Sequence, residues 1–276
     1  MRRKTCCLTG GPLMPLVLLG LMPAFMAHAQ AGPQDSGDQD LAAKVANPVS
    51  NLISVPLQSN YDCCYGPEKA SKYTLNLQPV VPFSINDRWN LITRTIIPYV
   101  NQGETAAGQD DTNGLGDITT SLFFSPKAAP GGIVWGIGPV LAWPTGASKL
   151  TSGKYSAGPT LIILKQSPGL TYGLLASHMW SYISLRDDRP DVSLTSLQPF
   201  ISRTLPDSTT FSANLESTYD WQSEQWTVPL NLSVSHIFRF GKQPVSLSGG
   251  VRGYLASPEG GADWGLRLQA TFLFPG

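Results

Sequence analysis

From about residue 50 onward, the chain alternates apolar and polar residues in short stretches separated by turns. In residues 73–85, every second residue is apolar or proline, and most residues between them are polar. The same alternation recurs in residues 226–239 and 264–274. A period of two places successive side chains on opposite faces of a β-strand. The pattern predicts about twelve strands, which start near Ile53, Lys72, Trp89, Asp117, Ile133, Tyr155, Leu170, Leu194, Thr209, Gln225, Pro244 and Asp263.

The connections between these predicted strands alternate between tight turns and longer loops. The tight turns are residues 86–88, 128–132, 167–169, 206–208 and 241–243, and the longer loops are residues 62–71, 101–116, 145–154, 184–191 and 256–262. Only the short connection at 222–224 breaks the alternation. Outer-membrane barrels combine an even number of strands with short periplasmic turns and longer outer loops. We therefore predict an all-β fold, a transmembrane up-and-down antiparallel barrel of about 12 strands over residues 51–276.

Composition favours this barrel over a soluble β-sandwich, which is the rival fold. The chain has 276 residues, of which 14% are charged, whereas soluble domains average about 25%. A sandwich would need a charged exterior around its two packed sheets. Lys and Arg number 19, as do Asp and Glu, and this balance argues against binding to nucleic acid. Trp and Tyr near the strand ends suit an interfacial girdle, although strands are enriched in aromatic residues in general.

The first 29 residues have the organisation of a cleaved signal peptide. Arg2, Arg3 and Lys4 precede an apolar stretch over residues 13–26, and Ala27-His28-Ala29 is a small-x-small cleavage site. The apolar stretch is shorter than the roughly 20 residues that a spanning helix needs. We expect export to an oxidising compartment and the outer membrane. Residues 30–50 are then a periplasmic leader, which is either a short helix that plugs the barrel or a frayed segment.

Two cysteines, Cys63 and Cys64, remain after the predicted cleavage. Adjacent cysteines close only a strained ring, and two ligands without partners define no metal site. We expect an incidental feature of a loop, the alternative being a redox-sensitive or intermolecular disulfide. The sequence predicts no metal and no cofactor.

If the apolar positions face lipid, the polar positions between them project into the lumen. The candidate lumen-lining residues are Asn76, Gln78, Arg94, Asp117, Glu216, Arg239, Arg252 and Arg267. Three of the arginines, Arg94, Arg252 and Arg267, are expected to oppose Asp117 and Glu216. Such a set forms either a polar path with a ligand site or a closed plug of ion pairs. A barrel of about twelve strands is narrower than a 16-stranded porin, which disfavours a wide pore.

No catalytic residues are predicted. The two histidines outside the signal, His178 and His236, share the strand parity of apolar residues, and the chain has no Gly-x-Ser-x-Gly elbow. Two alternatives to a channel stay open. One is a lipid-modifying barrel enzyme that uses His178 or His236, and the other is a structural or adhesive barrel that works through its long loops.

Several blocks, in one order from about residue 41 to the C-terminus, carry a resemblance to a known family. They include Asn47-Pro48-Val49, Trp89-Asn90-Leu91, Gly114-Leu115-Gly116-Asp117, Trp226-Thr227-Val228-Pro229-Leu230, Gly241-Lys242-Gln243-Pro244 and Leu273-Phe274-Pro275. The chain resembles the outer-membrane family named after the MetA-type protein of phenol degradation, whose members are often labelled transporters or neuromedin-U-like. The resemblance implies passive transport of small aromatic or otherwise hydrophobic compounds. The expected partners are outer-membrane lipid, an unknown small solute and the barrel-assembly machinery; the oligomeric state stays open.

Overall fold

The computed structural model describes residues 35–106 and 110–275, so the predicted signal peptide lies outside the described residues. These residues form one α-helix, one short 3-10 helix and fifteen strands. The elements are α1 (Asp35–Val45), β1 (Ile53–Tyr65), β2 (Ala70–Leu77), β3 (Val80–Ser84), β4 (Trp89–Gln102), β5 (Thr112–Leu115), β6 (Ile118–Pro126), η1 (Pro130–Gly132), β7 (Ile133–Trp143), β8 (Lys154–Ser167), β9 (Leu170–Ser184), β10 (Ser193–Thr204), β11 (Thr210–Leu215), β12 (Ser217–Asp220), β13 (Gln225–Phe240), β14 (Gln243–Ala256) and β15 (Trp264–Phe274).

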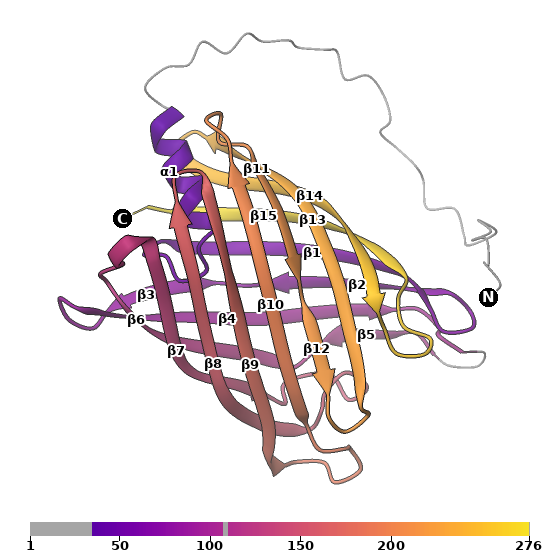
Figure 1. Ribbon diagram of the computed structural model, residues 1–276. Coiled ribbons are helices and arrows are strands. Elements are labelled where there is room, and N and C mark those ends of the chain that lie inside the picture. The colour runs from indigo at the N-terminus through magenta and orange to yellow at the C-terminus, as the bar shows by residue number, and fades with distance from the viewer. Residues whose placement is uncertain (1–34, 107–109, 276) are drawn as a thin grey trace, which may run out of the picture. The chain divides into compact units, whose positions relative to one another are not determined.

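The strands form one antiparallel sheet that closes on itself (Figure 1). The last strand pairs with the first, from Ile53 opposite Phe274 to Cys63 opposite Trp264. The pairing of β9 with β10 completes the ring. Three of the crossing strands are each interrupted once, as β2 and β3, β5 and β6, and β11 and β12, so the ring has twelve crossing strands. The predicted fold class, an up-and-down barrel of the transmembrane kind, is confirmed.

Each interruption lies opposite a proline on the neighbouring strand. The amide of Gln78 donates to the carbonyl oxygen of Pro56 at 2.9 Å, and the amide of Gly116 donates to that of Pro98 at 2.8 Å. The amide of Glu216 likewise donates to the carbonyl oxygen of Pro229 at 3.1 Å. Because proline has no N–H to donate, only one of the two hydrogen bonds of the antiparallel pair can form at these points. The strands therefore lose regular pairing there while their direction is kept.

The predicted strand starts agree with the structure, since each lies within two residues of an observed start. The predicted long loop at 62–71 is wrong. Pairing of β1 with β2 continues out to Tyr65 opposite Ala70, which leaves only residues 66–69 in the turn. Alternation is blurred here by a β-bulge at Cys63 and Cys64, so the period of two is lost before the strand ends.

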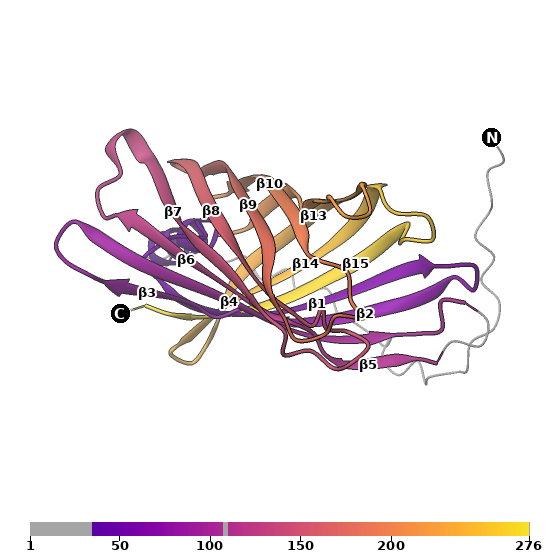
Figure 2. The same cartoon turned by 90° about the horizontal axis from the view of Figure 1, so that it is seen from below.

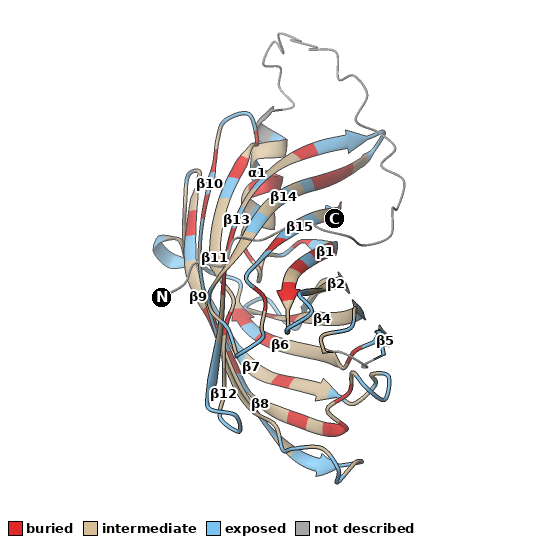
Figure 3. Cartoon of the chain, turned by 90° about the vertical axis from the view of Figure 1, so that its right-hand side faces the viewer, coloured by how far each residue is buried: buried red, intermediate tan, exposed pale blue. Residues whose placement is uncertain are grey.

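Apolar side chains cover the outside of the wall and polar side chains face the inside. Leu232 is 48% exposed while Asn231 beside it is 4% exposed, and Leu268 is 64% exposed while Arg267 is 8% exposed. Figure 3 shows short buried segments recurring along β7 and β8. Exposed aromatic rings lie toward the strand ends, where the interfacial girdles of barrels occur; they include Tyr61, Trp143, Trp180, Tyr182, Trp221, Trp226 and Trp264.

At one end of the barrel, α1 and the segment that follows it pack against the strands. Leu41 and Ala42 of α1 pack with Ile237 of β13 and Leu273 of β15. Figures 1 and 2 show α1 and the C-terminal end of the chain at the same end of the barrel, opposite the β1–β2 hairpin. No helix in the described part of the chain is long and apolar enough to cross a membrane.

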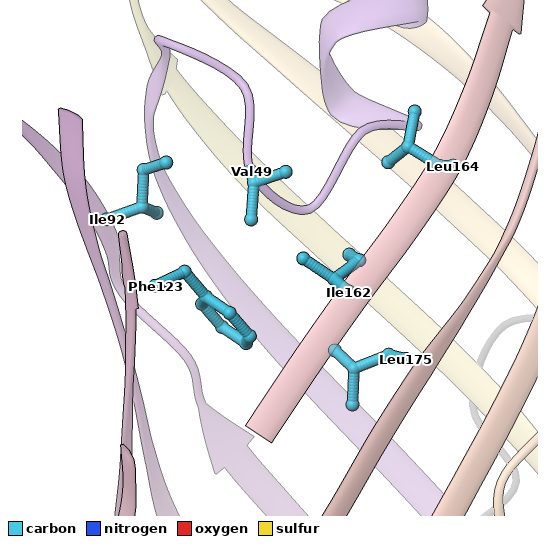
Figure 4. Packing of buried hydrophobic residues seen from close by; sticks show 6 residues of the cluster. All are labelled: Val49, Ile92, Phe123, Ile162, Leu164 and Leu175. Atoms are coloured by element: carbon cyan, nitrogen blue, oxygen red, sulfur yellow. The ribbon is translucent and has the colours of Figure 1, made fainter. Parts of the chain in front are cut away.

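The segment after α1 places Val49, which is 5% exposed, among inward-pointing apolar side chains of four strands (Figure 4). These side chains are Ile92 of β4, Phe123 of β6, Ile162 and Leu164 of β8, and Leu175 of β9. The inside of the barrel is therefore polar except where this segment enters it.

The approach of β7 to β6 requires a glycine at position 138. A Cβ on Gly138 would overlap the carbonyl oxygen of Leu122, whereas a Cβ on Gly253 would meet nothing within 4 Å. We expect Gly138→Ala to force the two strands apart and to lower the free energy of unfolding by about 1 to 3 kcal/mol. Urea unfolding followed by tryptophan fluorescence measures this, with Gly253→Ala as the matched control. Equal midpoints for the two variants would contradict the assignment.

Candidate functional site

The barrel interior contains a cavity of about 270 Å³. One end of its lining is formed by Ala42, Val45 and Asn47 of α1 and the segment after it, and Arg94, Glu216 and Arg267 contribute charged groups. Most of the wall between them carries hydroxyl and amide groups, among them Gln58, Gln198, Ser212, Asn214, Ser233, Ser235, Ser246, Ser248, Gln269 and Thr271. Such a wall can hydrogen-bond to water or to a small polar solute, because each hydroxyl both donates and accepts.

A cluster of charged groups crosses the interior beside this cavity. Arg267 on β15 donates from Nη1 and Nη2 to the two carboxylate oxygens of Glu216, at 2.7 and 2.8 Å. It also donates from Nε to Oδ1 of Asn60 on β1, at 2.7 Å. The fork of the guanidinium matches the carboxylate, so this is the strong bidentate form of the pair. Glu216 lies at the interruption between β11 and β12, and its side chain keeps the inward parity of Ser212 and Asn214, which line the same cavity.

A second arginine joins the cluster from β14. Arg252 Nη2 lies 3.7 Å from Glu216 Oε2, and Arg252 Nε lies 3.5 Å from Asp62 Oδ1. The side chains of Arg252 and Asp62 are 9% and 6% exposed. Gly265 leaves room for the Asp62 side chain, because a Cβ at that position would overlap Asp62 Oδ1. Two arginines therefore share one glutamate, with Asp62 as the second counter-charge.

Positive charge exceeds negative charge in this region. Arg94 on β4 donates from Nη2 to Oε1 of Gln78 at 3.0 Å, so its closest polar partner is a neutral amide. Lys72 lies directly across from Asp62 in the β1–β2 ladder, which puts both side chains on the inner face. Together with Arg252 and Arg267, four cationic groups face the carboxylates of Asp62 and Glu216.

The structure places the remaining predicted residues as follows. Asn76 lies opposite Gln58 in the ladder, on the inner face but outside the charged cluster. Arg239 lies at the short-turn end, where Nε donates to Oδ1 of Asp38 in α1 at 2.9 Å, and Nη2 donates to the same oxygen. Arg239 therefore anchors α1 to β13.

Asp117 is not opposite the arginines, so that expectation is wrong. Its Oδ2 accepts from the amide and the hydroxyl of Ser152, both at 2.7 Å, and its Oδ1 accepts from the amide of Gly146 at 3.0 Å. The interruption after β5 turns the carboxylate toward residues 144–153, the loop between β7 and β8. Both carboxylate oxygens are used to fix that loop.

The same loop is tied to the next one along the rim. Arg186 and Arg189 both donate to the carbonyl oxygen of Ser148, at 3.2 and 2.6 Å. Lys154 Nζ lies 3.1 Å from Asp191 Oδ1. The hydrogen bond and the charge of Lys154 lower the pKa of the Asp191 carboxyl from its ordinary value, so this tie weakens only as the pH falls through that lowered pKa.

The candidates predicted from the sequence do not include Asn60, Asp62 or Asp38, which make these contacts in the structure. The first two continue the inward parity of Gln58 along β1, so the period of two was sufficient to find them. Asp38 lies in the helix before the barrel, and no pattern in the sequence links it to Arg239.

The two histidines lie on the outer wall at opposite ends of the barrel. His178 Nδ1 is 2.7 Å from the hydroxyl of Thr195, and His236 Nδ1 is 3.1 Å from that of Thr209. A hydroxyl cannot stabilise an imidazolium as the carboxylate of a catalytic triad does. Within the described residues, no group of three or more His, Cys, Asp or Glu side chains could hold a metal ion.

No protein-family model matches the chain, and no curated protein matches its sequence. Its fold is similar to the crystal structure of an outer-membrane channel from Pseudomonas putida F1, with a TM-score of 0.65 and 15% sequence identity over 81% of this chain and 96% of that chain. A NanC porin has a TM-score of 0.49 at 11% identity, covering 79% and 98% of the two chains. The outer membrane phospholipase A from Escherichia coli has 0.48 at 11%, covering 85% and 98%. The first similarity establishes the barrel fold.

Removal of the Glu216 charge should destabilise the barrel, because both arginines then share only Asp62. We expect Glu216→Gln to lower the free energy of unfolding by about 1.5 to 3 kcal/mol, the range for hydrogen bonds to charged groups. Urea unfolding measures this, and Glu224→Gln in the exposed turn after β12 is the control. An unfolding midpoint unchanged from the parent would show that the pair contributes nothing.

Loss of the Asp117 carboxylate should release residues 144–153. We expect Asp117→Ala to raise the rate of tryptic cleavage after Lys149 by roughly tenfold or more. Cleavage follows the fraction of molecules in which this loop is open, and a loss of 1.4 kcal/mol from the closed loop raises that fraction about tenfold. Limited proteolysis of the folded protein measures it. Asp111→Ala, an exposed carboxylate of the preceding loop, is the control, and equal rates for the two variants would contradict this role of Asp117.

Proposed function

We propose that this protein is an outer-membrane channel for small solutes. One observation carries the proposal: a closed barrel with an apolar outer wall surrounds a polar cavity of about 270 Å³. The cavity lies just below the range of about 300 to 1,000 Å³ for the pockets of drug-sized ligands, so it suits one compound smaller than these. A wide diffusion pore does not fit this space.

The outer wall supports location in a membrane. A charge on the lipid face of a barrel costs about 2 to 4 kcal/mol at the midplane, and positions such as Leu161, Leu232 and Leu268 are apolar and exposed. We propose cleavage after Ala29, with the short turns and α1 on the periplasmic side, and insertion by the barrel-assembly machinery. Outer-membrane lipid is then the partner of the outer wall.

The charges of the interior favour an anionic solute. Arg94 has a neutral amide as its closest polar partner, and four cationic groups face two carboxylates. Rings of Arg and Lys select anions in pores. We also propose membership of the MetA-type family, on the blocks that resemble it, and from that resemblance alone comes the aromatic character of the solute. A small aromatic acid would satisfy both criteria.

The docked helix α1 narrows the path at one end. It is held by Asp38 on Arg239, and Gln166 Nε2 donates to the carbonyl oxygen of Ala43 at 2.7 Å. Below it, Val49 fills the apolar cluster of Ile92, Phe123 and Ile162. A solute passes only when this segment moves, so α1 and the residues up to Leu52 are the proposed gate.

Recording in planar lipid bilayers tests the proposal. We expect rare, small conductance steps for the parent protein, with a reversal potential under a KCl gradient that indicates anion preference. Arg239→Ala removes the ion pair to α1 and should make channel openings more frequent. The open population should rise roughly tenfold for each 1.4 kcal/mol lost from the free energy that holds α1 in place. Lys242→Ala, in the exposed turn between β13 and β14, is the control.

Two results would count against the proposal. Absence of both conductance and solute flux in the parent and in Arg239→Ala would exclude an open path through the barrel. Recovery of the protein as a soluble periplasmic monomer, without heat-modifiable migration on gels, would exclude the membrane location.

A further inference from the structure

We propose that Cys63 and Cys64 form a disulfide with each other, and that this bond holds the β-bulge in β1 beside the charged cluster. The proposal concerns the end of β1 near the β1–β2 turn, away from α1. It requires an oxidising thiol–disulfide environment and does not depend on channel activity.

The bulge is visible in the pairing of β1 with β2. Asp62 is opposite Lys72 and Tyr65 is opposite Ala70, so Cys63 and Cys64 together face Ser71 alone. Cys64 has a φ of 78°, in the region that glycine adopts readily and that a Cβ makes costly. Bulges with one residue in this region usually have glycine there. A cysteine in its place therefore needs a compensating interaction.

The two sulfur atoms provide one. In a regular strand, neighbouring side chains point to opposite faces, which would keep the sulfurs of adjacent cysteines apart. The positive φ at Cys64 breaks that alternation and brings the Sγ atoms to 2.6 Å from each other. The backbone conformation that is unfavourable for an isolated residue is thus the one that lets the two thiols meet.

The difference in burial of the two thiols indicates the order of the reaction. Cys63 is partly exposed while Cys64 is buried. The Cys63 thiol loses its proton to solvent and attacks the disulfide of a protein or small-molecule oxidant, which forms a mixed disulfide and releases one thiolate. The Cys64 thiol then gives its proton to the released thiolate and attacks the Cys63 sulfur. This attack forms the intramolecular bond and displaces the second thiolate, which takes up a proton from solvent in place of the one that Cys63 lost. Two cysteines are oxidised and one external disulfide is reduced to two thiols.

The bond would fix backbone that positions the charged cluster. Asp62, which pairs with Arg252, immediately precedes the bulge. The Cys63 carbonyl oxygen accepts from the amide of Asp263 at 3.2 Å, and the amide of Gly66 donates to Gly260 at 2.8 Å. The bulge thus joins the end of β1 to the 257–263 loop. A ring closed by adjacent cysteines is strained and hence easily reduced, so this junction would respond to the redox environment.

Mass spectrometry tests the bond. The full-length protein is isolated from cells that export it, denatured with N-ethylmaleimide and digested with trypsin, which releases residues 45–69 as one peptide. We expect this peptide to be unlabelled and lighter than the dithiol form by two hydrogen atoms, and to take two labels after reduction. Two labels without prior reduction would overturn the proposal, as would a disulfide-linked dimer on a non-reducing gel.

The same measurement on refolded barrel in oxidised and reduced glutathione separates this proposal from the proposed function. A bond that forms there supports the proposal even if the protein conducts nothing. A barrel that conducts but keeps both thiols at every glutathione ratio overturns it.

Variants at the two positions test the link to the bulge. We expect Cys63→Ser and Cys64→Ser to lower the unfolding midpoint in oxidising buffer. Addition of reductant should lower the unfolding midpoint of the parent protein to that of Cys63→Ser. Cys64→Gly lacks the bond but relieves the positive φ, so its midpoint should lie above that of Cys64→Ser. A parent midpoint that is insensitive to reductant and equal to that of Cys63→Ser would show that no bond holds the bulge.

Discussion

The structure depends on the hydrogen-bonded closure of one sheet. A wall that is apolar on its outer side can leave no backbone N–H or C=O unpaired where water is absent, and the β1–β15 ladder removes the last free edges. Everything inside the barrel follows from this closure. It encloses the polar side chains, gives them a common interior and brings Asn60 of β1 into contact with Arg267 of β15.

Closure also brings like charges close together inside the barrel, where they need a counter-charge. Arg267 and Arg252 come from neighbouring strands and would repel each other without Glu216 between them. Glu216 reaches that position by the same alternation as Asn214, because the register of β11 and β12 against β13 is unbroken on either side of it. Pro229 removes only a ladder hydrogen bond at this point, and the inward parity of the strand is kept.

The wall could be predicted from the sequence because alternation is a local property. Each strand start depends on a few neighbouring residues, and the inward parity of Gln78, Arg94 and Arg267 follows from it directly. The contacts between these residues could not be predicted in the same way. Asp117 has a charge and a strand position that suit an interior pair, yet its partners are the backbone and hydroxyl of a loop that closes over it. The bulge at Cys63 and Cys64 could not be predicted for a related reason, since an inserted residue has no signature in a period of two.

The docking of α1 has a consequence for how the molecule is assembled. The surface that receives the helix is made of Gln166 from β8, Ile237 and Arg239 from β13, and Leu273 from β15. These residues are spread over more than a hundred positions of the chain and meet only once the ring is complete. The helix is translated before any strand, but its binding surface is the last to exist. The helix that precedes every strand in the chain is thus seated only after those strands have paired, and a seated helix reports that the barrel behind it has closed.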